Sequence, residues 1–89
     1  MGKSDSGWFP RRLGYLDAFY YKDRERLLMI ISCSFSPSGL IYFLDVFDID
    51  GEYIVDGKSF LNLETAQLIG FSLLMASGLV DEICMIKKD

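Results

Sequence analysis

Five carboxylate side chains lie within twelve residues of one another, with no basic residue between them. Carboxylates at this spacing suit a hard cation, a catalytic acid–base pair or a basic surface on another protein. A solvated acidic rim on a turn is the simpler structural explanation for the same pattern. The residues are Asp45, Asp48, Asp50, Glu52 and Asp56.

The spacing of these carboxylates excludes a calcium-binding EF-hand loop. If Gly51 were the sixth residue of such a loop, Val46 would be its first residue and Gly57 its twelfth. Both positions require carboxylate ligands in that motif. We therefore expect no metal ion and no cofactor.

The remaining reactive residues do not form a catalytic set. The chain contains no histidine, which excludes Ser–His–Asp and Cys–His nucleophile systems and every histidine-ligated metal. It has two cysteines, Cys33 and Cys84, and no glycine-rich phosphate loop. Two cysteines do not form a disulfide framework, and they indicate a reducing, cytoplasmic setting. The sequence predicts a non-enzymatic protein.

The N-terminal segment combines large rings with positive charge. Trp8, Phe9, Arg11 and Arg12 could stack on bases and neutralise phosphates. The structural alternative is an arm that folds over a sheet and leaves its arginines in solvent. Residues 27–89 carry nine acidic and three basic side chains, which disfavours general binding to a phosphate backbone.

The chain is organised around residues 27–47, which read as two strands joined by a turn at residues 36–39. Pro37 and Gly39 have the conformational preferences that such a hairpin turn requires. The turn predicts a register in which four pairs share one face. The pairs are Phe35 with Leu40, Cys33 with Tyr42, Ile31 with Leu44 and Met29 with Val46. The second strand is apolar on both faces, so we expect it to be covered on both sides.

A membrane span is the alternative for this stretch, because residues 27–44 are uncharged over eighteen positions. The Ser-Pro-Ser-Gly turn interrupts it, and β-branched and aromatic residues dominate the rest. These features favour strands in a folded domain.

The flanking segments complete the expected architecture. Residues 15–21 predict a strand, with a helix over 13–21 as the alternative. The Asp50-Gly51 dipeptide predicts a hairpin that pairs Phe47 with Ile54 and Asp48 with Tyr53. Residues 1–7 are expected to form a flexible tail, and 8–89 a single domain.

Asn62 is a favourable N-cap for a helix that begins at Leu63, and Gly78 suits the position after its end. Residues 79–86 are expected to form a short strand. The sequence thus predicts an α+β fold, an antiparallel four-stranded β-meander followed by one apolar α-helix and a short C-terminal strand.

The helix is apolar nearly all round, and one chain of 89 residues has too few elements to cover it. We therefore expect a homodimer or an obligate heteromer that uses the outer face of the helix, at Leu68, Phe71 and Met75.

The function expected from these features is that of a small acidic interaction protein, an inhibitor, adaptor or complex subunit. Its acidic hairpin would bind a basic partner protein, in one version as a nucleic-acid mimic of viral or mobile-element type. A single-stranded nucleic-acid-binding module that uses the N-terminal segment is the first alternative. A small membrane-associated subunit is the second.

Overall fold

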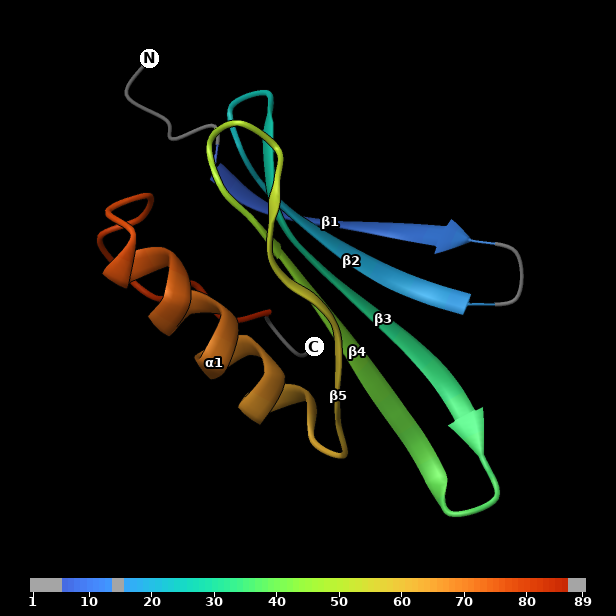
Figure 1. Cartoon of the computed structure of the whole chain (residues 1–89). Coiled ribbons are helices and arrows are strands. Elements are labelled where there is room, and N and C mark those ends of the chain that lie inside the picture. Colours follow the sequence, from blue (N-terminus) through green and yellow to red (C-terminus); the bar gives the residue numbers. More distant parts are fainter. Residues whose placement is uncertain (1–5, 14–15, 87–89) are drawn as a thin grey trace.

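The computed structural model describes the backbone of residues 6–13 and 16–86, and the side chains of residues 7–10 and 17–86. It shows an α+β fold with one antiparallel five-stranded sheet and one helix (Figure 1). The strands pair in chain order, β1-β2-β3-β4-β5, so the sheet is a meander. The elements are β1 Ser6–Leu13, β2 Leu16–Asp23, β3 Arg26–Ser36, β4 Gly39–Phe47, β5 Tyr53–Phe60 and α1 Leu63–Ala76.

The central hairpin has the predicted register. The turn between β3 and β4 pairs Phe35 with Leu40, and the three pairs that follow also match the prediction. Gly39 has a φ of 123°, a conformation that glycine adopts without a steric penalty. The side chains of Met29, Ile31 and Leu44 on the predicted shared face are fully buried.

The sheet has one more strand at its N-terminal edge than the sequence predicts. Residues 16–23 form β2, which confirms the strand prediction over the helix alternative. Residues 6–13 form β1, where no strand was expected. Pro10 lies in this edge strand, where the absence of a backbone N–H is tolerated on the outer side. The expected N-terminal tail lies largely outside the described residues, and β1 begins at Ser6.

Strand β5 is irregular, and its predicted register is wrong by one residue. Phe47 pairs with Tyr53 rather than with Ile54, and Val46 pairs with Val55. Ile54 is therefore an extra residue in β5, and a second irregularity lies at Gly57, whose φ is 70°. Such bulges break the simple two-residue alternation on which the prediction relied.

The helix α1 begins and ends as predicted. The Oδ1 atom of Asn62 accepts a hydrogen bond from the backbone N–H of Thr65 at 3.1 Å. At the other end, the N–H groups of Gly78 and Leu79 donate to the carbonyls of Met75 and Leu74, which is the Schellman arrangement.

Helix α1 covers one face of the sheet and contacts β3, β4 and β5. The closest approach is at Gly70, where a Cβ atom would lie 2.5 Å from the Met29 sulfur atom and 3.2 Å from a Leu44 methyl group. Phe71 is fully buried beside Trp8 and Tyr21, with ring centroids separated by 5.9 and 4.9 Å. These aromatic contacts join the helix to β1 and β2.

The C-terminal strand predicted over residues 79–86 is absent, and within the described residues α1 is the last regular element. The segment bonds to side chains instead of a strand edge. The indole N–H of Trp8 donates to the Cys84 carbonyl at 2.6 Å, and the N–H of Ile86 donates to Oε1 of Gln67 at 2.7 Å. These two bonds hold the segment beside β1 and α1 without a strand partner.

Candidate functional site: the acidic end

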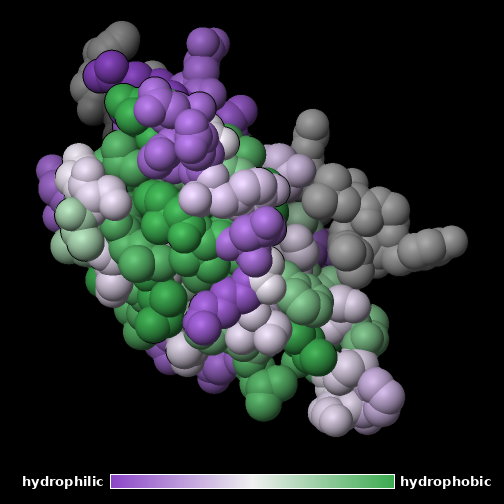
Figure 2. Space-filling model, in the orientation of Figure 1, coloured by the Kyte–Doolittle hydropathy of each residue, from purple (hydrophilic) through white to green (hydrophobic). Residues whose placement is uncertain are grey.

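The fold brings carboxylates from three separate segments to one end of the molecule, which we call the acidic end. In a meander, the β2–β3 and β4–β5 turns lie at the same end of the sheet, and α1 returns the chain to that end (Figure 1). Figure 2 shows hydrophilic side chains gathered over the β4–β5 turn. Three cations, Lys22, Arg24 and Arg26, lie in or beside the β2–β3 turn. The acidic end comprises Asp23, Glu25, Asp48, Asp50, Glu52, Asp81 and Glu82.

Asp48 shapes the β4–β5 turn. Its Oδ1 atom accepts hydrogen bonds from the backbone N–H groups of Asp50, at 2.9 Å, and Glu52, at 3.0 Å. The backbone N–H of Asp48 also donates to the Glu52 carbonyl at 2.9 Å. Asp48 is therefore committed to the turn, which presents the exposed carboxylates of Asp50 and Glu52 to solvent.

Asp45 lies apart from the acidic end, within β4. Its Oδ1 atom accepts a hydrogen bond of 2.8 Å from the backbone N–H of Gly57, at the β5 bulge. Partial burial raises the pKa of Asp45 above its ordinary value, the hydrogen bond from Gly57 lowers it, and the negative charge of Asp56 raises it. Of the five predicted partner-binding carboxylates, Asp45 and Asp48 thus stabilise the local backbone, and Asp56 is exposed along β5.

The β2–β3 turn adds Asp23 and Glu25 to the acidic end. Asp23 forms an ion pair of 2.9 Å with Arg26 across the base of the turn. Arg24 has a φ of 60°, which is unusual for a residue with a Cβ atom. Residues Arg26 and Leu27 line a hollow of about 320 Å³ together with residues 47–51, so the two turns are neighbours in space.

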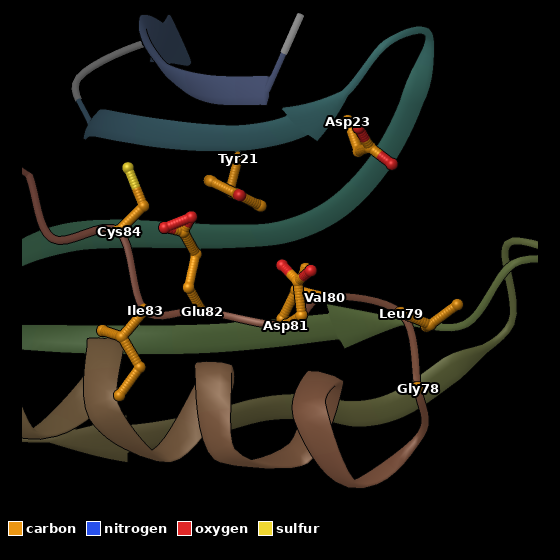
Figure 3. A pocket seen from close by; sticks show the side chains of 9 residues that line it. All are labelled: Tyr21, Asp23, Gly78, Leu79, Val80, Asp81, Glu82, Ile83 and Cys84. Carbon is orange, nitrogen blue, oxygen red and sulfur yellow. The ribbon is translucent and has the colours of Figure 1, made fainter. Parts of the chain in front are cut away.

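A larger cleft, of about 660 Å³, lies between the C-terminal segment and β2 (Figure 3). Tyr21 and Asp23 line one wall, and residues 78–84 line the other. The side chains of Asp81 and Glu82 are exposed, and Figure 3 shows them on the segment that faces Tyr21. The lining contains three carboxylates and no basic side chain. It therefore suits a cationic group rather than a phosphate.

Among the described residues, no group of three or more cysteine, aspartate or glutamate side chains is arranged to hold a metal ion. The excess of carboxylates at this end produces a negative electrostatic field, which attracts positive charge.

Trp8 and Phe9, two of the four residues predicted to contact nucleic acid, lie on different faces of the sheet. Trp8 packs in the aromatic cluster, with its ring 5.3 Å from that of Tyr21, and its indole N–H is bonded to the C-terminal segment. Phe9 is 47% exposed, and the Lys22 ammonium group lies 5.9 Å from its ring centroid. The side chains of Arg11 and Arg12 lie outside the described residues.

The three residues predicted for the oligomer interface do not share one face. Leu68 and Met75 are each 41% exposed, whereas Phe71 is fully buried in the core. The outer face of α1 is completed by Ile69, which is 39% exposed. Figure 2 shows hydrophobic surface over α1.

Both cysteines are free thiols. Cys33 is half-buried, and burial together with the neighbouring Asp17 carboxylate raises the pKa of its thiol, while a hydrogen bond with Tyr42 lowers it. A raised pKa reduces the thiolate fraction and hence the reactivity of Cys33. In the part of the chain that the structure describes, no helix has the length and apolar character needed to cross a membrane.

Asp23, Glu25, Asp81 and Glu82 were not predicted as part of the site. A signal for the first two was available, because alternate turns of a meander lie at one end of the sheet. The last two required knowledge of where the chain turns after α1.

Comparison with known proteins gives no relatives: no protein-family model, no curated protein and no solved structure matches the chain.

Proposed function

We propose that this protein is a non-enzymatic interaction protein that binds a basic partner protein through its acidic end. The observation that carries the proposal is the convergence of three sequence-distant segments, each with exposed carboxylates, at one end of the fold. Asp50 and Glu52 come from the β4–β5 turn, and Asp81 and Glu82 from the segment after α1.

Electrostatics support a protein partner over a nucleic acid. The net charge of the chain is −4, and five of the eight exposed acidic side chains among the described residues lie at this end. A concentrated negative field accelerates association with a positive surface, and salt reduces that acceleration. In a finer version of the proposal, the acidic end imitates a nucleic-acid backbone. Both cysteines are free, as a reducing, cytoplasmic setting would leave them.

The test compares two variants that carry the same change of net charge. In the first, Asp50→Asn, Glu52→Gln and Glu82→Gln neutralise the acidic end. In the control, Asp17→Asn, Asp56→Asn and Glu64→Gln neutralise exposed carboxylates elsewhere. Tagged proteins are used to capture partners from an extract of the native cell, and the association rate of the captured protein is then measured at several salt concentrations.

We expect the first variant to associate at least about tenfold more slowly and with a weaker salt dependence. The control variant should resemble the wild-type protein. Equal association rates for the two variants would contradict the proposal. Competition by duplex DNA for the captured partner tests the nucleic-acid-mimic version, and a captured protein that does not bind DNA would exclude it.

A further inference from the structure

The face of the sheet opposite α1 carries a continuous set of apolar, aromatic and charged side chains. We call it the open face and define it by the residues that alternate with buried ones on the three central strands. Phe9 on β1 and Tyr53 on β5 extend it to the two edges, with exposures of 47% and 56%. The defining residues are Tyr20, Lys22, Ile30, Phe43, Asp45 and Phe47.

Within the described residues, no element covers the open face. Helix α1 lies on the other side, where Gly70 approaches Met29 and Leu44 (Figure 1). The C-terminal segment also lies on the α1 side, because it bonds to Trp8 and Gln67. The open face is therefore uncovered by any described element, although Ala18, which pairs with Ser32 in this face, is buried among its neighbours.

The arrangement of the open face is self-complementary about its central strand. Tyr20 on β2 pairs with Ile30 on β3, and Ile30 pairs with Asp45 on β4, so the three form one row across the sheet. Lys22 lies two residues further along β2, beyond a bulge at which it pairs with Leu27. A two-fold axis along β3 exchanges β2 with β4. It brings Tyr20 of one copy over Asp45 of the other, and Ile30 against itself.

The same operation places opposite charges within reach. Lys22 of one copy lies one row, about 7 Å along the strand, from Asp45 of the other. Because the two sheets lie about 10 Å apart, the two Cα atoms are about 12 Å apart, a separation that the extended Lys22 and Asp45 side chains span together. Lys22 and Asp45 lie on opposite sides of the axis. In a two-fold dimer, each Lys22 can therefore pair with the Asp45 of the other copy.

We propose that the open face binds the open face of a second copy of this chain, in a two-fold dimer whose axis runs along β3. The dimer goes beyond the proposed function and does not rest on it. Two antiparallel sheets packed face to face, about 10 Å apart and rotated by about 30°, form a standard sandwich.

The size of the open face allows a small interface between two copies. Five strands spaced by about 4.8 Å, with about six residues each rising about 3.4 Å, cover about 500 Å² in each copy. The pair then buries about 1,000 Å² in total, which is the lower limit for a specific interface between proteins.

The chemistry of the open face disfavours single-stranded nucleic acid as its occupant. Stacking platforms for bases need cations along the strand path. The described side chains of the open face supply one cation, Lys22. Asp45 lies in the middle of the surface and Asp56 beside it, where they would repel phosphates.

The parallel orientation of the two copies places their acidic ends side by side. Each acidic end holds seven carboxylates against three cations, so the two ends repel each other, and we expect this repulsion to exceed the attraction of the two Lys22–Asp45 pairs. Salt should therefore strengthen self-association, because it weakens the repulsion between the acidic ends more than the attraction within the two pairs.

Analytical ultracentrifugation of the full chain tests the dimer with two matched variants. Ile30→Lys places like charges together on the axis, and Leu68→Lys makes the same change on the outer face of α1. We expect the wild-type protein and Leu68→Lys to be dimers at micromolar concentration. Ile30→Lys should raise the dimer dissociation constant more than about 100-fold, because like charges would face each other across the axis. Circular dichroism checks that each variant is folded.

A cross-link provides an independent measurement. In a Cys33→Ser, Cys84→Ser background, Ser32→Cys places a thiol on β3 at the open face, and Ser72→Cys places one on the outer face of α1. A short bis-maleimide should join Ser32→Cys into a covalent dimer, whereas sheets about 10 Å apart are too distant for a direct disulfide. Ser72→Cys should remain monomeric under the same conditions.

Several outcomes would overturn the proposal. In sedimentation, these are a wild-type protein that is monomeric, or a dimer that is lost in Leu68→Lys but kept in Ile30→Lys. In cross-linking, it is a covalent dimer that forms through Ser72→Cys and not through Ser32→Cys. If both lysine variants are monomeric, the cross-link decides between the open face and the helix.

Discussion

The two faces of the sheet use similar residue types for different purposes. On the face covered by α1, Met29, Ile31, Leu44 and Val46 are fully buried. On the open face, Ile30 and Phe43 come from the same two strands and remain only half-buried. Stability is therefore concentrated on the covered face, while residues of the open face can change with a smaller effect on folding.

The aromatic cluster gives the largest expected contrast. Phe71→Ala should lower the free energy of unfolding by about 3–5 kcal/mol, because it leaves a cavity beside Trp8 and Tyr21 in a region without solvent access. Phe43→Ala, its counterpart on the open face, should cost about 1 kcal/mol in the monomer. Urea denaturation measures both, and equal losses would contradict the difference between the faces.

The close approach at Gly70 sharpens the comparison. Gly70→Ala gains about 1 kcal/mol of helix propensity, but its Cβ atom would displace the buried Met29 sulfur atom. Because overpacking costs about 1–3 kcal/mol, we expect a net loss of stability of about 1 kcal/mol. Met29→Ala combined with Gly70→Ala should show a favourable coupling in a double-mutant cycle. Additive effects would indicate that the two residues do not interfere.

The parts of the fold that could be predicted from the sequence are those set by local patterns. The register of β3 and β4 follows from the turn at residues 36–39 and from regular alternation, and both hold in the structure. The helix ends at Asn62 and Gly78 follow from local capping chemistry.

The parts that could not be predicted depend on contacts distant in sequence. β1 contains Pro10, which is compatible with a strand only at the sheet edge. β5 departs from alternation at Ile54 and Gly57. The C-terminal segment is held by the Trp8 and Gln67 side chains, a placement that no local pattern encodes.

Trp8 tests how firmly that segment is attached to the covered face. Trp8→Phe keeps an aromatic ring beside Tyr21 but removes the N–H that bonds to the Cys84 carbonyl. We expect a loss of about 1 kcal/mol in unfolding free energy and faster amide exchange in residues 79–86. Unchanged exchange in this segment would show that Gln67 alone is sufficient to hold it.

Neutralising Asp45 gives the smallest expected effect, and the size of that effect depends on pH. Burial raises the pKa of Asp45 above the unfolded value of 3.8, so the folded state holds the proton more tightly than the unfolded chain does. Ionisation of Asp45 therefore opposes folding. The cost is absent below 3.8, appears as pH rises toward the folded pKa, and is complete above it.

Asp45→Asn removes this ionisation while its side-chain oxygen can still accept the N–H of Gly57. The variant should have a slightly higher Tm than the wild-type protein at pH 7, and the difference should vanish as the pH falls below 3.8. Asp45→Ala, which has no acceptor for Gly57, should be less stable than Asp45→Asn at every pH. The contrary result is a Tm difference between Asp45→Asn and the wild-type protein that is the same at every pH. That result would show that folding does not desolvate the Asp45 carboxyl group. Because Asp45 lies on the open face, these melts should be recorded at a concentration where the protein is monomeric, so that the ionisation cost is separated from any effect of the carboxylate on self-association.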